Sequence, residues 1–90
     1  TAAVAVCTTA LQHAPDDVAL RASRAVALVL AKRPAEAIAD FDRVVATGQA
    51  PEWRRMRGEA KAAAGDATGA QQDLAEACRL GDAAACQPKR

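Results

Sequence analysis

Aromatic side chains and catalytic groups are scarce in this sequence. Its 90 residues include one tryptophan, one phenylalanine, no tyrosine and a single histidine, His13. No Ser/His/Asp or Cys/His set stands at a usable spacing, and the glycines form neither a dinucleotide-binding nor a phosphate-loop motif. We therefore expect neither enzyme activity nor a cofactor. His13 is interpreted as a cation near a helix C-terminus, where the helix dipole favours positive charge.

The sequence also has no large excess of positive or negative charge and no long apolar run. The formal net charge is +1 with 26% charged residues, which argues against a dedicated nucleic-acid or membrane-surface protein. A basic cluster is interleaved with glutamates, so we interpret it as a solvated helix face and not as a nucleic-acid site. No apolar stretch approaches the roughly 20 residues that span a bilayer, and we expect no membrane insertion. The cluster is Arg54, Arg55, Arg57 and Lys61, and the glutamates are Glu52 and Glu59.

Cysteine is limited to Cys7, Cys78 and Cys86. Together with His13 they lack the short paired spacing of zinc ligands, so no metal site is expected. Cys7 falls in the apolar pattern of the first predicted helix and is interpreted as a small buried hydrophobe. Because the chain starts at Thr1 and shows no signal peptide, we expect a processed product or a piece of a longer protein.

The sequence is rich in alanine, shows helical periodicity and carries residues that typically begin or end helices. Alanine, the strongest helix former, makes up most of the 51% apolar residues, and no strand-like alternation occurs. Asp16 or Asp17 is expected to cap the second helix, and Gly48 to end the third in a left-handed conformation. The apolar run Ala25–Ala31 is expected to pack between two other helices. The predicted helices are 2–14, about 18–32, 34–48, one starting at Pro51, about 67–80, and a short start at 82–86.

The most informative feature is a set of residues that recurs 33 positions later in the chain, which we call the 33-residue echo. Alanine matches carry little weight in an alanine-rich chain, but the arginine, aspartate and glycine matches do. A fixed period of this length is typical of a helical repeat array, whose units bury their apolar faces against their neighbours. The matched positions are Arg21, Arg24, Ala27, Ala31, Ala37, Asp40, Gly48 and Ala50 in one copy, and Arg54, Arg57, Ala60, Ala64, Ala70, Asp73, Gly81 and Ala83 in the next.

On these residues the chain resembles the tetratricopeptide repeat family. Ala37-x3-Phe41 fits the second-helix signature of the family, Gly58 and Ala25 hold its small-residue slot, and Pro15 is its closing proline. The resemblance implies an all-α, right-handed α-α superhelix of about five helices plus a short sixth. Weaker forms of the signature are Ala70-x3-Leu74 and Ala3-x3-Cys7. The implied units are a half repeat at 1–15, repeats at 16–50 and 51–83, and the start of a further helix or tail at 84–90.

The chain departs from the family pattern at three positions. Arg21 and Arg54 stand where a bulky aromatic is usual, and Lys61 stands in the tyrosine slot. We therefore expect the repeat at 51–83 to be less well packed than the repeat at 16–50.

The resemblance also implies a function. In this family the first helix of each unit lines a concave face, so we expect a non-catalytic module that binds a peptide or protein partner there. The Lys/Asn/Arg set that clamps the C-termini of chaperones is absent. The alternative is a structural or assembly element that self-associates through exposed repeat ends. The residues mapped to the groove are Ala19, Ala22, Val26 and Val29, followed by Glu52, Arg55, Glu59 and Ala62.

The echo further predicts two internal ion pairs. Arg24 and Asp40 are 16 residues apart, and so are Arg57 and Asp73. In an antiparallel helix pair with a tight turn, this spacing places both residues at the same height on facing helices. We expect a half-buried, bidentate salt bridge within each unit.

The segment Cys78-Arg-Leu-Gly-Asp-Ala-Ala-Ala-Cys86 is similar to the Sel-like branch of the same superfamily. In cysteine-rich bacterial members, cysteines at this spacing form disulfides, so the resemblance implies a Cys78–Cys86 disulfide. The alternative is two reduced cysteines in a cytoplasmic repeat protein. A disulfide would imply a periplasmic or exported protein, because disulfides are rare in reducing cytosol.

Overall fold

The computed structural model of the chain describes residues 2–48 and 50–86, and all regular structure in these two ranges is helical. The expected all-α fold of five helices and a short sixth is confirmed. The helices are α1 (Ala2–His13), α2 (Val18–Leu30), α3 (Pro34–Ala46), α4 (Pro51–Ala63), α5 (Ala67–Arg79) and α6 (Ala83–Cys86). Helix α2 ends before the expected Lys32, because Lys32 takes a positive φ of 64° in the turn to α3.

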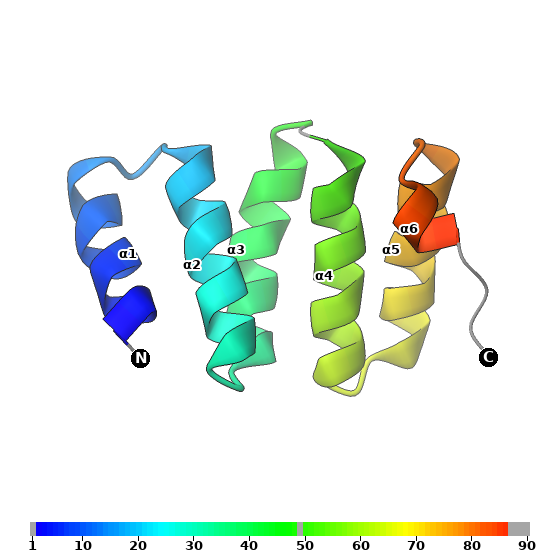
Figure 1. The fold of residues 1–90 in the computed structure, drawn as a ribbon, viewed down its shortest axis with the longest axis horizontal. Helices are drawn as coiled ribbons and strands as arrows, with labels where there is room; N and C mark the ends of the chain where they lie inside the picture. Colours follow the sequence, from blue (N-terminus) through cyan, green and yellow to red (C-terminus); the bar gives the residue numbers. More distant parts are fainter. Residues whose placement is uncertain (1, 49, 87–90) are drawn as a thin grey trace.

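The helices form a row in which each one packs against the next along the chain (Figure 1). Helices α2 and α3 make one antiparallel pair, and α4 and α5 make a second. The row measures 39 × 25 × 16 Å, with α1 and α6 at its opposite ends. This is the neighbour-to-neighbour packing of a helical repeat array.

Local sequence signals set the helix ends. The Asp17 carboxylate accepts a hydrogen bond from the Leu20 backbone N–H at 3.0 Å, so the N-cap is Asp17 and not Asp16. Pro34 and Pro51 occupy first turns, where the missing N–H costs nothing. Gly48 follows α3 with φ +74°, the left-handed conformation expected after a helix C-terminus.

The core is built mainly from small side chains with one aromatic anchor. Phe41 is 1% exposed and packs in a cluster with Leu28 and several alanines. Helices α4 and α5 bury glycine, alanine and Asp73 but no large apolar side chain. Gly58 permits their close approach, since a Cβ there would lie 3.0 Å from the Asp73 Cβ and 3.1 Å from the Ala70 carbonyl oxygen. The expected poorer packing of this pair stays a prediction.

Two sequence-based interpretations of burial need correction. Leu30, within the run expected to be enclosed between helices, is 77% exposed, because α1 and α3, the helices that pack against α2, leave its side chain uncovered. Cys7 is partly exposed and not buried, because α1 stands at the end of the row, where α2 is the main helix against it.

Candidate binding surface

An arginine–aspartate pair joins the two helices of each unit. Arg24 donates from Nε and Nη2 to the two carboxylate oxygens of Asp40, both at 2.7 Å. Arg57 donates in the same way to Asp73, at 2.8 and 2.7 Å. Both aspartates are buried. These are the positions at which the 33-residue echo predicts half-buried bidentate pairs, and the repeated geometry sets how each pair of helices is aligned.

The charge on these groups follows from their partners. Burial alone would raise the pKa of Asp73, but hydrogen bonds from Arg57 and Lys61 outweigh it and hold this pKa below its usual value. The hydrogen bond to Asp40 raises the pKa of Arg24, and the bond to Asp73 does the same for Arg57. Asp73, Arg24 and Arg57 therefore stay ionised near neutral pH, which suits a structural role.

The opposite, open side of α2 and α4 carries an apolar hollow. It has a volume of about 80 Å³ and lies between the two helices, with Phe41 of α3 at its base. A second, wider depression of about 400 Å³ adjoins it between α1 and α2 and shares Val26 and Leu30. We call this surface the α2–α4 face and define it by Val26, Val29, Leu30, Arg55, Met56 and Glu59.

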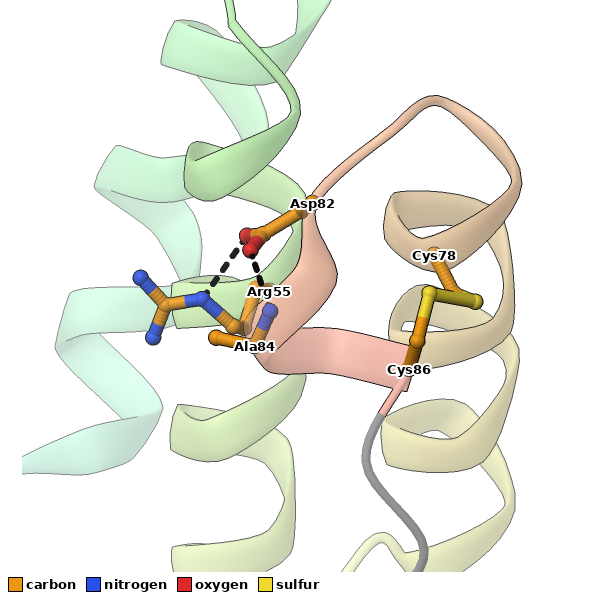
Figure 2. Close-up of a disulfide and its surroundings, with 5 residues drawn as sticks. All are labelled: Arg55, Cys78, Asp82, Ala84 and Cys86. Carbon is orange, nitrogen blue, oxygen red and sulfur yellow. Dashed lines mark hydrogen bonds and ion pairs between the residues drawn. A yellow bond between two sulfur atoms is a disulfide. The ribbon is translucent and has the colours of Figure 1, made fainter.

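The charged edge of the α2–α4 face is an ion-pair chain that reaches α6. Arg55 donates from Nε to Asp82 at 2.8 Å and from Nη1 to Glu59 at 3.2 Å. The other oxygen of Asp82 accepts a hydrogen bond from the Ala84 backbone N–H at 3.0 Å. Figure 2 shows Asp82 between Arg55 and the start of α6. The bond to Asp82 is the main cause that raises the pKa of Arg55. Arg55 is thus held in place by two carboxylates.

A disulfide joins Cys78 of α5 to Cys86 at the end of α6 (Figure 2), with their Cα atoms 4.7 Å apart. These are the two cysteines that the Sel-like resemblance pairs, and Cys7 takes no part in the disulfide. Helix α6 buries none of its residues. The disulfide and the Asp82 contacts therefore hold it against the array.

The residues mapped to the groove from sequence fall into three groups. Val26, Val29 and Glu59 line the hollow, and Arg55 bonds to Glu59 but does not itself line the hollow. Ala22 is only 2% exposed and faces the core, so it is left out of the surface. The remaining three are exposed but line neither depression: Ala19, Glu52 and Ala62.

Sequence reasoning missed Leu30, Met56 and Asp82. Leu30 continues the i, i+4 pattern of Val26, and Met56 stands at helical spacing on α4, so both could have been found. Asp82 could not, because its contact with Arg55 spans 27 residues and no motif links them.

Comparison with protein families gives a direct result. A profile of the tetratricopeptide repeat matches residues 1–60, two thirds of the chain. The chain belongs to the tetratricopeptide repeat family. Comparisons with curated proteins and with solved structures give no significant match. The profile ends before Cys78, so the likeness of the C-terminal segment to Sel-like repeats stays a prediction.

Tetratricopeptide repeats are protein-interaction and scaffold modules, and the family is generally non-catalytic. Among the residues that the structure covers, no helix has the length and apolar character needed to cross a membrane. Two of the residues that depart from the tetratricopeptide pattern contact the buried aspartates. Arg21 donates to Asp40 at 3.3 Å, and Lys61 lies 3.1 Å from Asp73, so each adds a second cation to a buried aspartate.

Proposed function

We propose that this chain binds a peptide segment of a protein partner on the α2–α4 face. The observation that supports this most is the apolar hollow beside the exposed Leu30. An apolar side chain placed there would be removed from water, which stabilises association by about 25 cal/mol per Å² of buried apolar surface. The bound segment would lie across the first helices of two successive units, with shape and a few polar contacts giving specificity.

Peptide selection tests the proposal while the partner is still unidentified. A random dodecapeptide library displayed on phage is panned on the protein, and selected peptides are titrated calorimetrically against wild type and Leu30→Asp. A charge in the apolar contact should weaken binding at least about tenfold, equivalent to about 1.4 kcal/mol. Because Leu30 is exposed, the melting temperature should hardly change.

Val6→Asp is the matched control. Val6 is also a large exposed apolar residue, but it lies on α1 and lines neither depression. Its substitution should leave peptide binding unchanged. If binding instead responds only to substitutions of Ala39, Arg43 or Gln72 on α3 and α5, the site lies on the other face and the proposal is wrong.

A second candidate function is assembly through the ends of the row. Val6 on α1 and Leu80 at the end of α5 are exposed large apolar side chains at opposite ends of the array. Such residues can pack against a neighbouring copy. Light scattering coupled to size exclusion distinguishes this function: assembly requires a mass that rises with concentration and falls in Val6→Asp. A monomer at every concentration contradicts it.

A further inference from the structure

The two halves of the α2–α4 face differ in charge. The α2 half, with Val26, Val29 and Leu30, is uncharged. The α4 half and the adjoining turn carry Arg55, Glu59 and Asp82, which are one cation and two carboxylates. The surface therefore combines an apolar hollow with an excess of negative charge along one edge.

Arg55 is poorly suited to receive an anionic partner group in this arrangement. Its Nε is bonded to Asp82 and its Nη1 to Glu59, and the side chain is only 26% exposed. Asp82 is itself fixed by the Ala84 N–H and by the disulfide that closes α6 onto α5. The Nη2 group of Arg55 bonds to no described residue, but a carboxylate or phosphate approaching it would meet repulsion from Asp82 and Glu59, whose two negative charges exceed the single positive charge of Arg55. Arg55 thus acts as a positioning residue for Glu59.

The Glu59 carboxylate can accept further hydrogen bonds. Its side chain is 58% exposed and lines the hollow beside Val29, Leu30 and Met56. Arg55 engages only its Oε2 atom, and at the longest distance in the chain of ion pairs, 3.2 Å. Glu52, one turn before Arg55, is exposed and forms no ion pair with any described residue. Lys32, in the turn after α2, pairs with neither glutamate.

We propose that the partner segment of the α2–α4 face is cationic and amphipathic, with an apolar side chain in the hollow and a lysine or arginine within about one turn of it, bound to Glu59. This inference rests on the proposed function and adds the chemistry of the partner. Charge complementarity supports it, because an unsaturated carboxylate borders the apolar contact while the neighbouring cation is already paired with two carboxylates. Charges at the edge of such an interface contribute mainly to the choice of partner.

The test uses the peptides selected by phage display. The enriched sequences should contain an apolar residue with a lysine or arginine nearby. For one such peptide, replacing the basic residue by glutamine should weaken binding about three- to tenfold, and glutamate should weaken it further. Affinity should also fall as salt rises, because the pair is partly exposed.

Glu59→Gln and Glu36→Gln form a matched pair of protein variants. Both glutamates are more than half exposed and both pair with an arginine one turn away, but Glu36 lies on α3 and does not line the hollow. Glu59→Gln should reproduce the loss seen with the glutamine peptide, whereas Glu36→Gln should not. Glu59→Lys should restore binding to the peptide in which glutamate replaces the basic residue.

Three results separate the possible failures. If acidic peptides are enriched, or if Glu59→Gln has no more effect than Glu36→Gln while Leu30→Asp abolishes binding, the charge inference is wrong and the binding face stands. If Leu30→Asp leaves binding of every selected peptide unchanged, the proposed function itself fails. If a free cationic amino-acid amide binds as tightly as the peptide, the site takes a small ligand and the partner proposed here is wrong.

Discussion

Asp40 and Asp73 are the two acidic side chains among the described residues that are classed as buried, at 4% and 5% exposure. Each lies between two cations: Arg24 and Arg21 contact Asp40, while Arg57 and Lys61 contact Asp73. A buried carboxylate costs several kcal/mol in lost hydration unless it is paired and hydrogen-bonded. Because the pairing is complete here, removing one partner should cost far more than an ordinary surface substitution.

Asp40→Ala is therefore expected to destabilise the protein by about 1.5–3 kcal/mol, the range for hydrogen bonds to charged groups. Arg24 and Arg21 lose the carboxylate that they share, and α2 loses this ionic contact with α3. The free energy of unfolding is measured in urea. Asp42→Ala, an exposed aspartate on the same helix that also pairs with an arginine, serves as control and should cost less than about 0.5 kcal/mol. If the two variants lost similar free energies of unfolding, the ion pairs of Asp40 would contribute no more to stability than an exposed pair does.

The lowered pKa of Asp73 gives a pH dependence with a definite sign. The folded state holds this carboxylate ionised more strongly than the unfolded chain does, so its contribution is present above the unfolded pKa of about 3.9. It is lost as the pH falls through the lower, folded value. Urea unfolding between pH 6 and pH 2 should show stability declining below about pH 4, and Asp73→Asn should reduce that slope. An unchanged slope in the variant would mean that other carboxylates carry it.

At the scale of the elements, helix pairs differ in how closely they approach. Gly58 of α4 lies against Ala70 and Asp73 of α5, whereas the same slot in the other unit holds Ala25. The α2–α3 pair accommodates a methyl group there with Ala25 fully buried. The α4–α5 pair has no such room, because the nearest atoms include a backbone carbonyl oxygen.

Gly58→Ala should consequently destabilise the protein even though alanine is the better helix former. Propensity favours the change by about 0.8–1.0 kcal/mol, while overpacking against backbone costs about 1–3 kcal/mol. We expect a net loss of up to about 2 kcal/mol in urea unfolding. Ala25→Gly, which leaves a gap at the matching position, provides the reciprocal variant and should also destabilise. A stabilised Gly58→Ala would show that α5 shifts away at little cost.

The helices and their alignment were open to prediction because their signals are local or repeated. Asp17, Pro34 and Gly48 mark helix ends through chemistry within a few residues. Arg24 and Asp40 could be paired because a second copy of the spacing exists in Arg57 and Asp73. Helical spacing places Leu30 beside Val26, but its 77% exposure could not be predicted, since it depends on how α1 and α3 pack against α2. The position of Asp82 depends on how α6 folds back, which has no counterpart elsewhere in the sequence.

At the scale of the whole molecule, the two ends of the array differ in how firmly their last helices are held. Stability in such arrays is roughly a sum over units and the interfaces between them. At the α6 end, a disulfide and the Arg55–Asp82 pair hold the last helix. At the α1 end, Val6 is exposed and Cys7 is only partly covered.

Reducing the disulfide should lower the free energy of unfolding by about 2–3 kcal/mol, the value expected from the entropy of a short closed loop. Unfolding is followed by circular dichroism with and without reductant, and Cys78→Ser/Cys86→Ser provides a variant that reductant cannot affect. Hydrogen exchange should show that protection is lost first in α6. Three alkylated thiols in the protein before reduction, detected by intact mass, would contradict the disulfide and with it this prediction.

The disulfide also changes how the chain responds to pulling. Under tension applied at its two ends, the segment from Cys78 to Cys86 cannot lengthen, so the fully extended chain is shorter by roughly 20–25 Å than it would be if reduced. Force applied at Cys86 passes through the disulfide directly to Cys78, so residues 79–85, which include Asp82, bear no load. Single-molecule pulling with and without reductant measures this difference in contour length directly.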